Sequence, residues 1–186
     1  MKKLFTLLFS LALLLGCCVS QAEAPVKTEL GSINMNGAFR LQCTLPEDYE
    51  IAIGSKDDEG LTAVISAKDE TKPMMFLAIE FDEIYYDVKR MNDMTEEQLQ
   101  QIIDTFSNDG DEVTVSYRET SHGTKLMIVQ EAVDSVDYLA IVSVYEGYMI
   151  EFDLMASAAS EEGLTESQIQ MCIDFLSDLD FIPEEA

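Results

Sequence analysis

Hydrophobic and polar residues alternate along several stretches of the chain, and a period of two predicts β-strands. Ala38 to Leu45 alternates in this way until Pro46 ends it, and Val113 to Tyr117 and Tyr148 to Leu154 follow the same rule. Shorter apolar runs between turn residues predict further strands at Tyr49 to Gly54, Ala63 to Ile65, Met74 to Phe81, Lys125 to Glu131 and Tyr138 to Tyr145. The run from Met74 to Phe81 is nearly all apolar, so we expect a central strand covered on both faces.

Two other stretches have the helical period, and each opens with the same capping signature. Thr95 and Gln98 have the spacing of a capping box, and Thr165 and Gln168 repeat it. The apolar stripes that follow are Leu99, Ile102, Ile103 and Phe106 in the first helix, and Ile169, Cys172, Ile173 and Leu176 in the second. Because tight turns such as Glu146-Gly147 join antiparallel strands, the sequence predicts an α+β fold, a mainly antiparallel sheet with two main amphipathic helices packed on it.

The order of these elements resembles a known fold. A strand ending in Leu45-Pro46 with Tyr49 three residues on, a central meander, and a closing helix that runs into Leu179-Asp180-Phe181 are together similar to the PsbP-like α/β/α sandwich. In that family the proline is commonly followed by a tryptophan or tyrosine. The resemblance covers nearly the whole exported part of the chain and implies an α/β/α sandwich. Family members include exported lipoproteins and protein-binding factors, mostly without catalytic residues, so the resemblance also implies a non-enzymatic role.

The first residues have the pattern of a secretory signal peptide. Lys2 and Lys3 precede the apolar run Leu4 to Leu15, which is too short to remain in a membrane as a spanning helix. Leu14-Leu15-Gly16-Cys17 resembles a bacterial lipobox, in which the cysteine receives a lipid and becomes the new N-terminus. Ser20 to Ala24 instead offers the small residues that an ordinary signal peptidase prefers. The position of the lipobox directly after the apolar run favours lipidation at Cys17.

These patterns divide the chain into three parts. We expect a signal peptide over residues 1–22, a flexible tether over 23–32, and a single acidic domain over 33–186. The protein is then extracytoplasmic and anchored to a bacterial membrane through the lipid on Cys17, or else plainly secreted. Apart from that lipid, no membrane contact is expected.

Charge excludes some classes of partner. The chain has 36 acidic and 11 basic residues and a net charge of −25, and cleavage would also remove Lys2 and Lys3. Such a polyanion repels nucleic acids and anionic lipid headgroups, and no run of Lys and Arg makes a local exception. The partner is therefore an unidentified protein or a small ligand.

Two cysteines follow the signal, and both are expected to be buried. Cys43 lies on the apolar side of a predicted strand and Cys172 in the stripe of the second helix. They could form one disulfide or remain two thiols, and the pattern slightly favours thiols. The sequence contains no CxxC motif and no cysteine–histidine ligand set that would indicate zinc, and no cofactor is expected.

The sequence contains no catalytic motif, but several side chains are candidates for a functional site. His122 is the single histidine, and its neighbours favour a hairpin turn over a catalytic base. Asp109, Asp111 and Glu112 supply oxygen ligands for calcium without the order of an EF-hand, so a turn that ends the first helix is favoured.

The best candidate for a ligand-facing patch is Tyr85 and Tyr86 beside Asp82 and Glu83, in the loop that follows a central strand. With these candidates, the sequence favours a non-catalytic extracytoplasmic binding or scaffold lipoprotein. The alternatives are a secreted hydrolase that uses paired carboxylates, and a plain secreted calcium-binding domain.

Overall fold

The protein folds around two antiparallel β-sheets. The computed structural model describes residues 26–107, 113–131, 138–157 and 163–184. The larger sheet has seven strands in the order β3 (Tyr49–Lys56), β4 (Gly60–Ala67), β5 (Met74–Phe81), β9 (Tyr148–Met155), β8 (Tyr138–Tyr145), β7 (Lys125–Glu131) and β6 (Val113–Glu119). The smaller sheet has three strands in the order β1 (Thr28–Ile33), β2 (Phe39–Cys43) and β10 (Asp180–Pro183). No helix within the described ranges is long and apolar enough to cross a membrane.

Two α-helices begin where the capping signatures predict. Helix α2 (Glu96–Phe106) follows Thr95, whose backbone N–H donates to Gln98 Oε1 at 3.0 Å while its hydroxyl oxygen accepts from the Gln98 N–H at 3.2 Å. Helix α3 (Glu166–Ser177) follows Thr165, whose N–H donates to Gln168 Oε1 at 2.7 Å. Both capping boxes are therefore confirmed. The short 3₁₀ segments η1 (Glu83–Tyr85) and η2 (Met91–Asp93) lie between β5 and α2.

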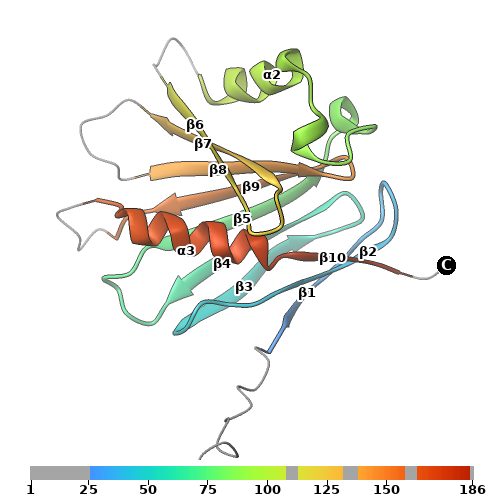
Figure 1. Ribbon diagram of the computed structural model, residues 1–186. Coiled ribbons are helices and arrows are strands. Elements are labelled where there is room, and N and C mark those ends of the chain that lie inside the picture. Colours follow the sequence, from blue (N-terminus) through green and yellow to red (C-terminus); the bar gives the residue numbers. More distant parts are fainter. Residues whose placement is uncertain (1–25, 108–112, 132–137, 158–162, 185–186) are drawn as a thin grey trace, which may run out of the picture.

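The two faces of the larger sheet are covered by different elements. One face, called here the α3 face, packs against α3 and the smaller sheet; on it the Phe152 and Phe175 rings stack with centroids 5.1 Å apart. The other face, called the α2 face, is covered over β6, β7 and β8 by α2 and the 3₁₀ segments, with Ile102 packed among buried residues of β7 and β8. In Figure 1, α2 lies above β6, β7 and β8, whereas α3 lies in front of the middle of the sheet and runs into β10.

The expected fold class is wrong. The protein is mainly antiparallel β, with ten strands in two sheets and two α-helices within the described residues, and not a sheet sandwiched by two main helices. The reason is that the smaller sheet shares the cover of the α3 face with α3. Its strand β1 was hidden because a bulge between Glu29 and Gly31 interrupts the alternation, and β10 is short and contains Pro183.

Two further expectations differ from the structure. Strand β5 is not covered on both faces: Met75, Leu77 and Ile79 are buried, but Phe76 and Ala78 on the α2 face are only partly covered because α2 lies over the other end of the sheet. The tether expected over residues 23–32 overlaps β1, where Leu30 already joins the core. Residue 28 is therefore already paired in a sheet, ahead of the start at residue 33 that the sequence pattern predicts.

Candidate functional site

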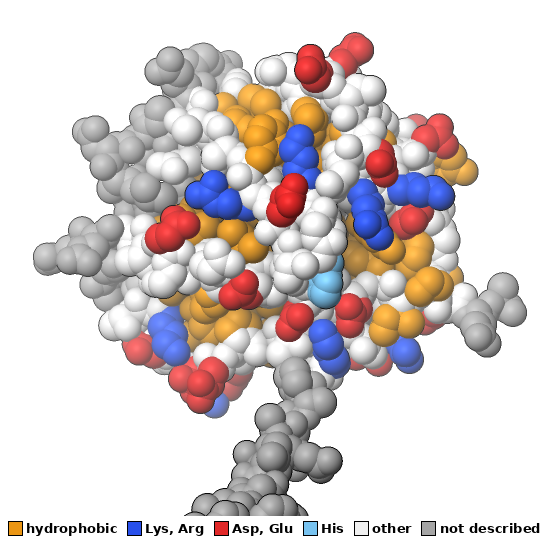
Figure 2. All heavy atoms as spheres, viewed as in Figure 1, with side chains coloured by type: hydrophobic (Ala, Val, Ile, Leu, Met, Phe, Trp, Pro, Cys, Tyr) orange, Lys and Arg blue, Asp and Glu red, His pale blue; other side chains and the backbone are white. Residues whose placement is uncertain are grey.

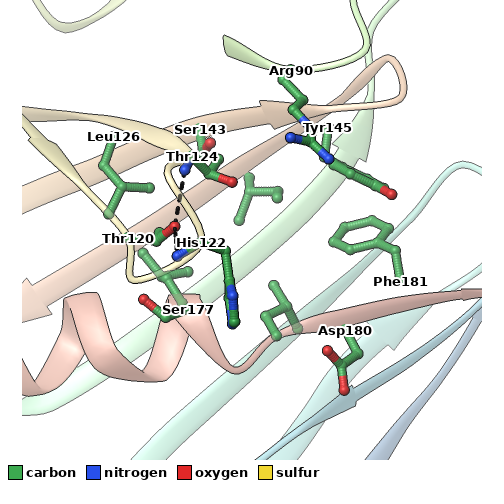
Figure 3. Close-up of a pocket in the computed structure, with 13 residues that line it drawn as sticks. Arg90, Thr120, His122, Thr124, Leu126, Ser143, Tyr145, Ser177, Asp180 and Phe181 are labelled. Atoms are coloured by element: carbon green, nitrogen blue, oxygen red, sulfur yellow. Dashed lines mark hydrogen bonds between the residues drawn. The ribbon is translucent and has the colours of Figure 1, made fainter. Parts of the chain in front are cut away.

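A cavity of about 300 Å³ opens on the α3 face. It is bounded by the turn between β6 and β7, the C-terminal end of α3, the start of β10, and the end of β8 (Figure 3). Leu126 and Ile150 are buried side chains of the larger sheet that form apolar parts of the lining. A volume of this size is at the lower end of the range for small-molecule sites.

Two buried aliphatic hydroxyl groups line this cavity. Thr120 is 8% exposed and Ser143 is 4% exposed, and apart from tyrosines they are the two polar side chains that the described part of the chain buries. Both line the cavity. Thr120 Oγ1 accepts from the backbone N–H groups of His122 at 3.3 Å and Thr124 at 3.0 Å, so its own hydrogen stays free to donate. Ser143 Oγ donates to the Lys125 carbonyl at 3.2 Å, which leaves its lone pairs free to accept.

One wall of the cavity is aromatic. The rings of Tyr145, at the end of β8, and Phe181, in β10, are tilted with centroids 4.7 Å apart. Phe39 packs edge-on against both, at 6.4 Å and 6.0 Å. Because these contacts join three strands of two sheets, the wall is set by the packing of the sheets and not by a loop.

Arg90 and Asp180 are the charged side chains at the cavity, and His122 also lines it. The Arg90 backbone pairs with Tyr145 in an isolated bridge, while its exposed side chain forms no ion pair with any described residue. Asp180 is different, because Lys27 Nζ lies 3.4 Å from its carboxylate and also donates to the Asp178 carbonyl at the end of α3, at 3.0 Å. Figure 3 shows Arg90 and Asp180 on opposite sides of the aromatic wall.

The surface around the cavity also combines hydrophobic and charged side chains. In the space-filling view of this side, the single histidine lies beside a hydrophobic patch, with Lys or Arg side chains above it (Figure 2). His122 does lie in a turn, as predicted, since the Gly123 N–H donates to the Thr120 carbonyl at 2.9 Å. The same turn nevertheless forms part of the cavity wall, which the sequence did not indicate.

Of the residues that the sequence singled out as a ligand-facing patch, Tyr85 does not lie on the surface. Tyr85 is 3% exposed and packs in the core beneath α2, whereas Tyr86 is 56% exposed. Burial raises the pKa of the Tyr85 phenol. Asp82 caps η1, where Oδ1 accepts from the Ile84 N–H at 2.8 Å, and Glu83 is exposed in that same turn. A 3₁₀ segment sends consecutive side chains in different directions, which separates the two tyrosines.

The two described cysteines, Cys43 and Cys172, are free, buried thiols and do not form a disulfide. Burial raises the pKa of Cys43 to about 11 and that of Cys172 to about 12, so both are unreactive at neutral pH. The Cys172 thiol donates to Met75 Sδ at 3.6 Å. Cys17 and the calcium candidates Asp109, Asp111 and Glu112 lie outside the described residues. Within the described ranges, no group of three or more His, Cys, Asp or Glu side chains could hold a metal ion.

A pair of carboxyl groups lies on the α2 face, away from the cavity. Glu151 and Asp153 are on the same side of β9, and their strand neighbours are apolar: Ala78 and Val142 beside Glu151, and Phe76 and Ala140 beside Asp153. Burial, the Asp153 carboxylate and a hydrogen bond to it raise the pKa of Glu151 to about 7. Burial also raises the pKa of Asp153, although it accepts a hydrogen bond from the Tyr138 hydroxyl at 2.7 Å.

Comparison with known proteins adds no relative: no model of a protein family matches the chain, and no curated protein matches it.

Proposed function

We propose that this chain is a non-catalytic extracytoplasmic binding lipoprotein whose domain takes a small ligand in the cavity beside α3. The observation that carries the proposal is the placement of the Thr120 and Ser143 hydroxyls, both buried and both in this cavity. Burying a polar group costs free energy unless its hydrogen-bonding capacity is used. A ligand with an acceptor for Thr120 and a donor for Ser143 would use the capacity that the protein leaves open.

The hydroxyl groups of the cavity support binding rather than catalysis. Ser143 donates to the Lys125 carbonyl, and Ser177 Oγ donates to the Ile173 carbonyl at 2.8 Å. A nucleophilic serine instead donates to a general base, such as the imidazole of His122. Neither serine hydroxyl has that arrangement. The two described cysteines are buried in the core with raised pKa values, so they do not supply a nucleophile either.

The proposed location rests on the N-terminal pattern. The charged start and apolar run support export, and the lipobox supports anchoring through Cys17. The acidic domain would then stand outside the membrane, where a cavity exposed on one face can sample small molecules of the medium or the envelope.

The test is binding of small probes to the full chain, with one variant that fills the cavity. The probes are 3-phenylpropanol, 3-phenylpropylamine and 3-phenylpropionate, which share an apolar body and differ in their end group. Ser177→Trp places a large side chain at the cavity wall, and Gln170→Trp places the same side chain on the exposed side of α3, away from the cavity.

We expect saturable shifts in a two-dimensional NMR titration for at least one probe, lost in Ser177→Trp and kept in Gln170→Trp. Thermal melts of both variants check that each is folded. The proposal is overturned if no probe binds the wild-type chain, or if both tryptophan variants bind as well as the wild type.

A further inference from the structure

The charges around the cavity do not balance one another. At the α3 end, Lys27 lies against both the Asp180 carboxylate and the Asp178 carbonyl, so the Asp180 carboxylate already has a cationic partner. At the other end, the Arg90 side chain makes no ion pair or hydrogen bond with a described residue. An arginine stays charged at all accessible pH values. The permanent charge that the cavity leaves open is therefore positive.

Between Asp180 and Arg90, the cavity wall suits the apolar or aromatic part of a ligand. Tyr145 and Phe181 form a wall braced by Phe39, and Arg90 is attached through its backbone to Tyr145. Arg90 is therefore held next to the end of β8 that carries the Tyr145 ring. A ligand that lies along the wall would bring its end group to Arg90, whose planar fork matches a carboxylate with two parallel hydrogen bonds.

We infer that the ligand of this cavity is a small organic anion with an apolar or aromatic body, held by Arg90 at the anionic end and by Tyr145 and Phe181 along the body. The inference rests on the proposed function, because it names the class of ligand for the same cavity. It also makes Arg90 the residue that determines specificity. Against a net charge of −25, which repels anions at long range, selection for an anion has to come from a local contact of this kind.

The experiment compares probes of nearly the same shape and different charge on the full chain. They are 3-phenylpropionate, its neutral analogue 3-phenylpropanamide, the cation 3-phenylpropylamine, and phenylalanine, which adds an ammonium group to the 3-phenylpropionate skeleton. Arg90→Gln removes the charge at the cavity. Arg40→Gln is the matched control, because Arg40 is exposed on β2, forms no ion pair with a described residue and does not line the cavity.

We expect 3-phenylpropionate to bind about fivefold or more tightly than the amide, the size of one partly exposed charge pair. Arg90→Gln should remove that preference, and Arg40→Gln should keep it. Equal binding of acid and amide to the wild type, or a preference that survives Arg90→Gln, overturns the anion assignment and leaves the proposed function standing. Tighter binding of phenylalanine or of the amine than of 3-phenylpropionate also overturns it, because an open negative site would then select the ligand. If no probe binds, the proposed function fails together with the inference.

Discussion

Replacing Glu151 with Gln should make the protein more stable at alkaline pH and leave its stability nearly unchanged at acidic pH. In the folded protein Glu151 lies among apolar residues of three strands, beside the Asp153 carboxylate. Burial and that neighbour raise its pKa from the ordinary 4.5 to about 7. The folded state therefore holds a proton that the unfolded state releases.

The sign follows from this difference. At pH values below 4.5 the carboxyl is protonated in both states and has no effect on the free energy of unfolding. Between 4.5 and about 7 the folded state binds more protons than the unfolded state, so the stability falls as the pH rises. Above about 7 the group is ionised in both states, and the full cost of a partly buried charge remains.

A change from 4.5 to about 7 would correspond to roughly 3 kcal/mol, because a tenfold change in a protonation equilibrium is about 1.4 kcal/mol. Glu151 is only partly buried and titrates together with Asp153, so solvent screening and the shared proton reduce this figure. We expect Glu151→Gln to gain about 1 to 2 kcal/mol at pH 8 and close to nothing at pH 4.

Urea unfolding of the full chain at the two pH values measures the effect, followed by circular dichroism because the chain has no tryptophan. Glu29→Gln is the matched control, since Glu29 is exposed on β1 and forms no ion pair with a described residue. It removes the same charge from a polyanion without changing a buried site. A gain that is equal at pH 4 and pH 8, or no larger at pH 8 than that of Glu29→Gln, would contradict this explanation.

Two further predictions concern the cysteines and the N-terminus. Cys43 and Cys172 should resist alkylation by iodoacetamide at pH 8 in the folded protein and react fully in urea, because both thiols are buried and have raised pKa values. Peptide mapping measures the labelling of each cysteine, and rapid labelling without urea would contradict the prediction. Mass spectrometry of the mature chain should find a diacylglyceryl Cys17 at its N-terminus, whereas an unmodified N-terminus at Glu23 would show that ordinary signal peptidase cleaves the chain.

Local signals in the sequence were enough for several elements. The capping boxes at Thr95 and Thr165 depend on side chains three residues apart, so they form in any context that allows a helix. The turn at Glu146 and Gly147 is equally local: both residues have positive φ angles, 49° and 81°, as a two-residue hairpin requires. The alternation of Tyr148 to Leu154 likewise predicted strand β9, because a strand with different faces must alternate.

Other features depend on contacts between distant parts of the chain. The bulged strand β1 and the short strand β10 form only by pairing with β2, and together the three strands add a second sheet beside α3 that the sequence did not predict. The cavity is a still clearer case, since Arg90, Thr120, Ser143 and Phe181 come from four segments and none carries a motif. Local sequence was enough to show where the two helices begin, where the Glu146–Gly147 turn lies and which residues face inward in the strands that alternate, because these features depend on neighbours a few positions apart. Only the tertiary structure decided the fold class, the burial of two hydroxyls in one place and the open charge of Arg90, because each depends on which distant side chains the packing of two sheets brings together.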